Sequence, residues 1–408
     1  MKNVLFNRTF HPVGHGAFFS ESIRLDNGDY FNVVYDCGSI ATNLARTAVE
    51  KYNHKRNHID LIFISHFDYD HINGLKFLAE KKLVDNKTYL FIPYYHPVLH
   101  QLRGTEQDDK TYYSGIEEMF RLLQRNRVRI VMVEAVESRK ETYYEPRVIP
   151  WRYLEDYEER NINGINSFTI QSGTRITIGG ARWNEIWNYV PFNYGITIEQ
   201  IDKITNLLKE DPLKLIDDQG LIKSEETINI LSQPNDDPQK KALLRIYNTI
   251  GYKKMNDTSL QLLSFAGDKS ATTEKEEIEE HIKSKYSFQP VVFDKHFEML
   301  LHSASRSRFS CLYTGDTNLK KEDSIESIKS MKGDFLNDDL FIIQIPHHGS
   351  VNNYNPEIVS LAKVGFVNFK PYLNSRHCHF DKNIPLDYLR ENVPLFFVTD
   401  KGVSTFGL

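Results

Sequence analysis

Residues 61–75 read Leu-Ile-Phe-Ile-Ser-His-Phe-Asp-Tyr-Asp-His-Ile-Asn-Gly-Leu. The apolar run at 61–64 is short and partly β-branched, which predicts a buried strand. From His71 to Lys82 the apolar residues have helical spacing, so a helix is expected there. Four metal-binding side chains therefore lie on a strand-to-helix turn: His66, Asp68, Asp70 and His71. Side chains of these types at one point could hold one or two divalent cations, which predicts a metalloenzyme.

Composition limits the classes of protein to consider. The 408 residues suffice for one large α/β domain or two smaller ones, and the formal net charge of -5 provides no global basic field for nucleic acid. The three cysteines form no CxxC pair, which suits a reducing compartment. Neither a signal peptide nor a run of about 18 apolar residues is visible, so we expect a cytoplasmic protein without membrane contact.

Strand-like segments alternate with helical patterns along the chain, which predicts an α/β or α+β sandwich with a site along one sheet edge. We expect a single domain over residues 1–408 with two insertions. The first, at about 94–165, is mixed and largely polar. The second, at about 195–255, has amphipathic helical spacing. These helices could cover the site as a lid, mediate homodimerisation or contact a partner protein, and the sequence does not decide between these roles.

Later strands also end in metal-binding side chains. Asp316 follows a strand at 310–313, and His347 and His348 follow a strand at 340–345. His379 comes shortly after a strand at 364–369. Several separate strand ends thus supply carboxylates and imidazoles to one sheet edge, which strengthens the prediction of a metal site.

Together these motifs resemble those of the metallo-β-lactamase fold superfamily. The His-x-Asp-x-Asp-His form at 66–71 is most similar to the hydrolase domain of ComEC-type competence proteins. His15 and Ala17 stand where that family has Gln and Asp, and no membrane channel accompanies the motifs, so DNA uptake is not implied. The other similar motifs are Val13-Gly14-His15-Gly16, Asp36-Cys37-Gly38, Asn256-Asp257-Thr258-Ser259-Leu260, Thr314-Gly315-Asp316, Pro346-His347-His348-Gly349-Ser350, Arg376-His377-Cys378-His379 and Thr399-Asp400-Lys401-Gly402.

The resemblance implies an αββα metallo-β-lactamase sandwich of two facing mixed sheets that holds two divalent metal ions, zinc or manganese. His66 and Asp68 would belong to one metal site, and Asp70 and His71 to the other. Asp316 would bridge the sites and His347 would complete the second. Asp257 is a candidate for the missing ligand of the first site. Residues expected to act in other roles are Asp70, His348 and His379 in catalysis, Arg376 and Ser350 in substrate binding, and Asp36 in support of the histidine loop.

Two divalent cations about 3.5–4 Å apart stabilise the attacking and leaving oxygens of a phosphodiester hydrolysis. Asp68 in place of a histidine makes the first site more anionic and favours manganese. We therefore expect a metal-dependent hydrolase, a phosphodiesterase or nuclease whose substrate is nucleic acid or a nucleotide. The same fold also hosts hydrolysis of amides, lactones and thioesters. A non-catalytic, metal-containing regulatory protein is the remaining alternative.

Several polar features have simpler interpretations. The histidines at 11, 15, 96 and 100 are expected to be structural or solvent-exposed. Arg125, Arg127 and Arg129 lie near aromatic residues and could bind a single strand by stacking, but a solvated helix end followed by a strand explains them as well. The charged helical pattern at 274–286 is expected to be a solvated face.

Overall fold

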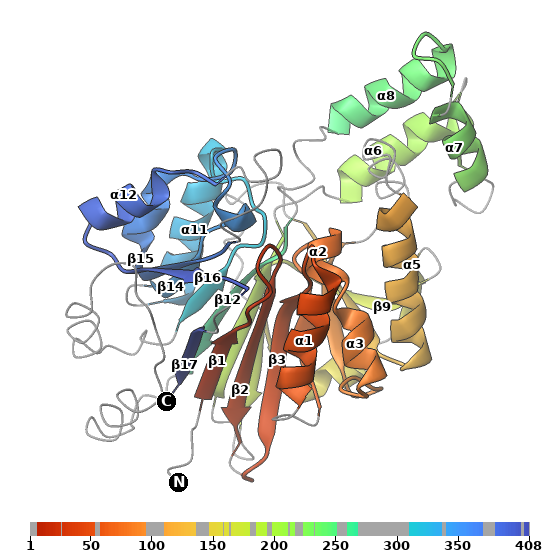
Figure 1. The fold of residues 1–408 in the computed structure, drawn as a ribbon. Helices are drawn as coiled ribbons and strands as arrows, with labels where there is room; N and C mark the ends of the chain where they lie inside the picture. Colours follow the sequence, from red (N-terminus) through yellow and green to blue (C-terminus); the bar gives the residue numbers. More distant parts are fainter. Residues whose placement is uncertain are drawn as a thin grey trace, which may run out of the picture.

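Two facing β-sheets form the centre of the protein in the computed structural model (Figure 1). Within the described residues, one sheet has nine strands and the other has eight. In sheet order the first contains β17 (Ser404–Gly407), β1 (Phe6–Phe10), β2 (Phe18–Arg24), β3 (Tyr30–Cys37), β4 (Leu61–Phe63), β5 (Tyr89–Pro93), β6 (Arg129–Val133), β9 (Ile165–Ile170) and β8 (Arg160–Ile162). The second contains β16 (Leu395–Val398), β15 (Ala362–Asn368), β14 (Leu340–Gln344), β13 (Cys311–Tyr313), β12 (Gln261–Ala266), β11 (Glu185–Phe192), β10 (Arg175–Gly179) and β7 (Val148–Pro150).

The structure describes most of the chain, with gaps. The described residues are 6–25, 27–53, 58–94, 110–135, 147–157, 159–162, 165–179, 185–193, 198–210, 213–216, 223–231, 233–250, 259–267, 310–336, 340–369, 380–400 and 404–407. The predicted strand at 291–293 and the predicted helix at 274–286 lie outside these residues.

Both sheets are mixed. In the first, β3, β4, β5, β6 and β9 are parallel, whereas the strands from β17 to β3 pair antiparallel. In the second, the strands from β13 to β16 are parallel, and β10 to β13 are antiparallel. The carboxyl ends of β3, β4, β13 and β14 all carry predicted site residues. Parallel strands present such ends at one sheet edge, which is where α/β proteins place their ligands.

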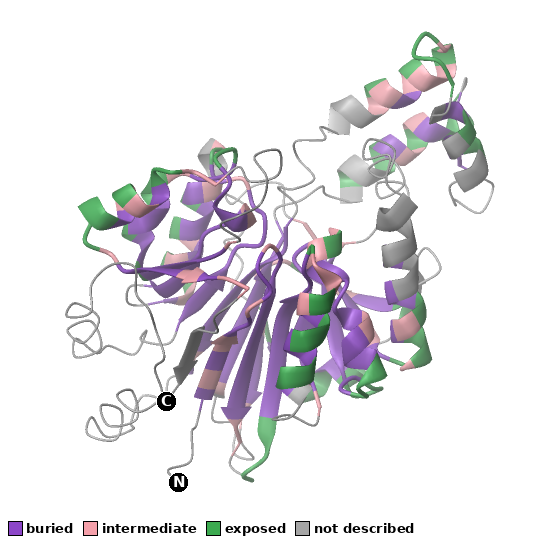
Figure 2. Cartoon of the chain, in the orientation of Figure 1, coloured by how far each residue is buried: buried purple, intermediate pink, exposed green. Residues whose placement is uncertain are grey.

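Large aromatic residues fill the space between the sheets. Phe19, Tyr35 and Phe63 from the first sheet pack in one buried cluster with Tyr313 and Phe366 from the second. Successive side chains of a strand point to opposite faces of the sheet, and in these strands the side chains on the outer face are apolar as well. Those outer faces form two further buried clusters beneath helices. Figure 2 shows most strand residues buried, apart from the exposed start of β3, and shows exposed residues along α1 and α12.

Helices cover both outer faces and give four layers. On the first sheet lie α1 (Thr42–Asn53), α2 (Tyr69–Ile72), α3 (Leu75–Glu80) and α5 (Lys110–Arg125). On the second lie α11 (Glu322–Phe335), α12 (Ile384–Arg390) and the 3₁₀ segment η7 (Pro356–Leu361). Two other 3₁₀ segments are η2 (Trp151–Asp156) and η6 (His347–Gly349). The order of layers confirms the predicted αββα sandwich.

The two segments expected to be insertions differ from each other. The second carries α6 (Ile198–Lys209), α7 (Ser224–Leu231) and α8 (Pro238–Ile250), which share a small apolar cluster and lie apart from the sheets in Figure 1. The first, 94–165, contributes β6 and β8 to one sheet and β7 to the other, so it belongs largely to the sandwich. The sequence pattern at 128–133 indicates β6, whereas β7 and β8 are only 3 residues long each and are surrounded by polar sequence, which hides them from pattern analysis.

The helix expected at 71–82 is two helices, α2 and α3, separated at Asn73 and Gly74. Gly74 donates its N–H to the carbonyl of Cys37 at 2.7 Å. A Cβ at Gly74 would lie 2.6 Å from that same carbonyl oxygen, so only glycine permits this approach. The break holds the turn at 66–71 against the end of β3. Among the described residues, no helix combines the length and apolar character needed to cross a membrane.

Candidate metal centre

A buried carboxylate from β3 fixes the turn that follows β4. Asp36, with φ of +52°, accepts hydrogen bonds from the N–H of Ser65 on Oδ1 and from its hydroxyl on Oδ2, both at 2.7 Å. Oδ2 also lies 2.8 Å from Nδ1 of His71. A proton on Nδ1 of His71 donates to this carboxylate, which orients the ring and leaves Nε2 facing the site.

His66, His71 and Asp316 form what we call the inner group. All three are buried, and one nitrogen or oxygen atom of each lies within 4.8 Å of the others. Nε2 of His71 is 3.4 Å from Oδ1 of Asp316, whereas Nε2 of His66 is 3.7 Å from Oδ2. The two oxygens of one carboxylate therefore face two different imidazoles.

A glycine turn brings Asp316 to this position. Gly315 has φ of +55°, and a Cβ on it would lie 2.7 Å from Cβ of Ser65. The Thr-Gly-Asp turn thus packs directly against the histidine loop, which no other residue would permit. The backbone N–H of Asp316 donates to Ser259 Oγ at 3.1 Å, and Asn353 Nδ2 donates to its carbonyl at 2.9 Å. These bonds fix the backbone and leave the side chain to the site.

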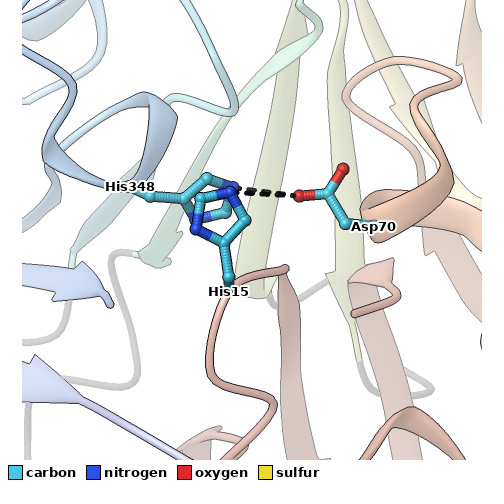
Figure 3. A group of neighbouring side chains, drawn as sticks. All are labelled: His15, Asp70 and His348. Atoms are coloured by element: carbon cyan, nitrogen blue, oxygen red, sulfur yellow. Dashed lines mark hydrogen bonds and ion pairs between the residues drawn. The ribbon is translucent and has the colours of Figure 1, made fainter. Parts of the chain in front are cut away.

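His15, Asp70 and His348 form the outer group (Figure 3). Nε2 of His348 lies 3.2 Å from Oδ2 of Asp70, and Nε2 of His15 lies 3.9 Å from the same oxygen. The two imidazole rings pack on each other with centroids 4.0 Å apart. Figure 3 shows both rings on the same side of the carboxylate. This group is nearer to solvent, with the side chain of His15 19% exposed.

His347 and Asp68 flank the inner group. Nε2 of His347 is 3.6 Å from Oδ2 of Asp316, and Oδ2 of Asp68 is 3.2 Å from Nε2 of His66. The side chains of His347 and Asp68 are 33% and 22% exposed, so the centre opens to solvent on this side. His347 and His348 both have left-handed φ, at +49° and +53°. This backbone directs one histidine to the inner group and the next to the outer group.

Charge strongly perturbs the groups of the centre. Burial alone would raise the pKa of Asp70, but the neighbouring imidazoles of His71 and His348 outweigh it and lower that pKa to about 2. Burial opposes ionisation of Asp316. The imidazoles of His347 and His71 favour it and hold the pKa of Asp316 well below its usual range. Burial, with the nearby imidazole of His348, lowers the pKa of His15 to about 3. The carboxylates are therefore ionised and His15 is a neutral imidazole at physiological pH, the forms that bind metals.

The residues present fit divalent cations. Within the described part of the chain, Nε2 of His66, Nε2 of His71 and Oδ1 of Asp316 are buried without a hydrogen-bond partner. Buried polar atoms are nearly always bonded, and imidazole nitrogens and carboxylate oxygens are ligands of zinc and manganese. Four carboxylates lie in the centre, so two divalent cations would balance their charge: Asp36, Asp68, Asp70 and Asp316.

Most of the predicted site residues come together in this centre, although the structure groups them differently from the expected division into two sites. His71 lies with His66, and Asp70 lies with His348 and His15. Ser350, expected to bind substrate, is buried, and its N–H donates to the carbonyl of His347 at 2.8 Å. Three candidates lie outside the described residues: Arg376, His379 and Asp257.

His15 is the site residue that sequence reasoning missed, since it was expected to be structural or exposed. It stands between two glycines with left-handed φ, Gly14 at +66° and Gly16 at +153°. A Cβ on Gly16 would lie 2.9 Å from the carbonyl oxygen of Asp70. A histidine between two glycines was the available signal, because such a turn can approach another backbone closely.

Comparison with known proteins gives one family. Residues 14–139 match the family model described as "Anti-Pycsar protein Apyc1", a segment that includes His15, Asp36 and the turn at 66–71. No curated protein matches. This finding overturns the assignment to the metallo-β-lactamase superfamily and to ComEC-type competence proteins, which was wrong. The motifs behind that assignment are short ligand patterns, and such patterns report the chemistry of a site more than its family.

Proposed function

We propose that this chain is a metal-dependent phosphodiesterase that hydrolyses cyclic nucleotides. The matched family, Anti-Pycsar protein Apyc1, counters cyclic nucleotide signalling. Hydrolysis of the cyclic phosphodiester is a direct way to remove such a signal. The match spans about a third of the chain, and it covers the residues at which β3 and β4 supply the centre.

The observation that carries the proposal is the position of the Asp316 carboxylate. Its Oδ1 faces His71, and its Oδ2 faces both His66 and His347. A carboxylate with differently surrounded oxygens suits a bridge between two cations. In such a pair, His66, Asp68 and His347 would belong to the Oδ2 side, and His71 and Asp70 to the Oδ1 side.

When bound, two divalent cations would supply charge stabilisation for a phosphodiester and an activated water. The protein's own residues would orient the metal ligands and the attacking water. Asp36 holds the ring of His71 through Nδ1, and Ser65 fixes Asp36 in turn. Asp70, ionised at neutral pH, would accept a hydrogen bond from the attacking water on its free oxygen.

The surroundings favour a small substrate over a nucleic acid strand. The arginine patch that could contact a single strand ends at Arg129, which lies at the amino end of β6. The centre lies beyond the carboxyl ends of β3 and β4, at the opposite edge of the same parallel strands. Arg129 also packs over the ring of Tyr89 and donates to its hydroxyl at 2.8 Å. A nucleotide at the centre would not reach this patch.

The test uses the full chain, stripped of metal and then supplied with Mn²⁺ or Zn²⁺. It is incubated with 3′,5′-cyclic mononucleotides of several bases, single-stranded DNA and RNA, and an acyl ester, lactone and thioester. We expect conversion of cyclic nucleotides to linear monophosphates and a loss of at least about 10³-fold in Asp70→Asn, which retains the size of the side chain. The surface variant Asp334→Asn is the matched control and should keep full activity. Turnover of acyl substrates alone, or equal activity of Asp70→Asn, would refute the proposal.

A further inference from the structure

We propose that the outer group holds the cation on the Oδ1 side of Asp316, and that His15, supplied by the glycine turn at 13–16, is one of its ligands. The inference rests on the metal centre of the proposed function. It adds a ligand that the motifs of the sequence did not include to the cation that Asp70 would hold. We call this ion the outer cation and the ion on the Oδ2 side of Asp316 the inner cation.

The distances fit a shared cation. Atoms bound to one tetrahedral zinc lie about 3.3–3.5 Å from each other when each bond is about 2.0–2.2 Å. In the outer group, the distances from Oδ2 of Asp70 are 3.2 Å to Nε2 of His348 and 3.9 Å to Nε2 of His15. All three ligand atoms lie within 4.8 Å of one another, so small side-chain rotations would bring them onto one ion.

The turn that carries His15 is held in place by bonds from distant parts of the chain. The carbonyl of His15 accepts the N–H of Ile40 at 2.8 Å, and the carbonyl of Gly16 accepts Nδ2 of Asn368 at 3.2 Å. The N–H of Ala17 donates to the carbonyl of Asp70 at 3.2 Å. The turn is thus fastened to the backbone of the residue whose side chain His15 faces. Such support limits the ligand to the few orientations that metal binding needs.

A structural role for His15 is the competing explanation, because its ring stacks on that of His348. Stacking alone does not require a nitrogen directed at Asp70. At 3.9 Å the contact of Nε2 with the carboxylate is too long for a hydrogen bond, and His348 already bonds to the same oxygen. A cation would satisfy both imidazoles and the carboxylate together. Replacing the imidazole with a ring that has no nitrogen distinguishes the two explanations, because this change keeps the stacking and removes the ligand atom.

The donor set predicts which cation enters and how tightly. Two imidazoles and one carboxylate suit zinc, cobalt and nickel more than manganese or magnesium. The inner group is buried, whereas His15 and Asp70 have side chains 19% and 17% exposed. The outer cation should therefore bind more weakly than the inner one and exchange faster.

The experiment titrates the metal-free full chain with Co²⁺, followed by calorimetry and by visible absorption of the bound ion. Wild type should bind two ions with distinct affinities. His15→Phe, which keeps an aromatic ring on His348, and His15→Gln, which keeps a polar side chain, should each weaken the second ion by at least about 100-fold and leave the first within about threefold. His58→Gln is the matched control, since His58 also lies beside a carboxylate, 3.9 Å from Asp60, and it should bind two ions as wild type does.

The outcomes distinguish this inference from the proposed function. Two ions in wild type with an unchanged second affinity in His15→Phe would overturn the role of His15 while leaving the phosphodiesterase proposal intact. Binding of no ion by wild type would overturn both. Loss of the first ion in place of the second would overturn the assignment of His15 to the outer group. Thermal unfolding of each metal-free variant accompanies the titration, and a folded His15→Phe that loses only the second ion supports the proposal.

Discussion

Two buried carboxylates, Glu21 and Asp316, show how differently the same kind of group can be surrounded in one protein. Glu21 lies between the sheets, and four donors reach it. Oε1 accepts from Nε of Arg8 at 2.7 Å and from the hydroxyl of Tyr313 at 2.8 Å. Oε2 accepts from the hydroxyls of Tyr189 and Ser264, both at 2.7 Å. This network joins strands of both sheets, and each oxygen of the carboxylate is satisfied.

Asp316 follows Tyr313 by three residues, yet its carboxylate is left open. Among the described residues, Oδ1 has no hydrogen-bond partner, and Oδ2 lies 3.6 Å and 3.7 Å from the imidazoles of His347 and His66. Its backbone is held by hydrogen bonds at both its N–H and its carbonyl. A closed polar network stabilises the fold, whereas a carboxylate with an open oxygen on a hydrogen-bonded backbone is suited to a ligand. The following substitutions test this difference.

The largest effect is expected for Asp316→Asn. The amide has the size of the carboxylate but cannot bridge two cations, so hydrolysis should fall by about 10⁴-fold, which corresponds to about 5 kcal/mol. Steady-state assays with a cyclic nucleotide measure the loss, and circular dichroism checks that the variant is folded. Retention of activity within about tenfold would mean that Asp316 is no bridge.

Arg8→Met should act on stability and leave the centre unaffected. It leaves Glu21 as an uncompensated buried charge, which typically costs about 3–5 kcal/mol. Urea unfolding of the metal-free protein measures this cost, and the folded variant should still bind two cations. The control is Arg390→Met, which breaks a surface pair with Asp387 and should cost less than about 1 kcal/mol. Equal costs for the two variants would remove the distinction between the closed network and an ordinary surface pair.

Asp36→Asn tests whether the hydrogen bond between Asp36 and His71 is needed for His71 to bind a metal. An amide nitrogen facing Nδ1 of His71 would favour the tautomer with a proton on Nε2, the atom that faces Asp316. Loss of such support commonly weakens metal affinity about 10- to 100-fold. Calorimetric titration with Zn²⁺ measures the affinity, and Asp29→Asn, at an exposed turn, is the control. Unchanged affinity would show that His71 does not depend on Asp36.

A third carboxylate, Asp60, is intermediate between Glu21 and Asp316 in how far its oxygens are satisfied, and its substitution should have the smallest effect. Burial, with the nearby carboxylate of Asp85, raises the pKa of Asp60 to about 6, although the N–H of Asn32, which donates to it at 2.7 Å, and the imidazole of His58 favour the ionised form. The folded state therefore prefers the protonated form, so this contribution to stability is present below about pH 4 and is lost as the pH rises through 6. In urea unfolding, the stability of Asp60→Asn relative to wild type should be about 2 kcal/mol higher at pH 8 than at pH 4.5. An equal difference at both pH values would contradict this.

Local patterns in the sequence predicted a sandwich of helices and strands and most of the centre, whereas the αββα order of the layers came from the family resemblance. The apolar run before His66 and the strand ends before Asp316 and His347 are local features, because strand period and turn residues lie close together in the chain. The position of His15 was not predicted, since its turn is held by a hydrogen bond that Asn368 donates to the carbonyl of Gly16, 352 residues away in the chain. The opposite orientations of His347 and His348 depend on left-handed φ values that histidine rarely adopts. The pairing of ligands into groups is thus a property of the folded backbone.

Anomalous diffraction at the zinc edge, from crystals of the metal-loaded full chain, tests the account most directly. We predict two peaks about 3.5–4 Å apart, with the two oxygens of Asp316 each about 2.0–2.2 Å from a different peak. A single peak, or peaks that leave Asp316 without a metal bond, would contradict the account.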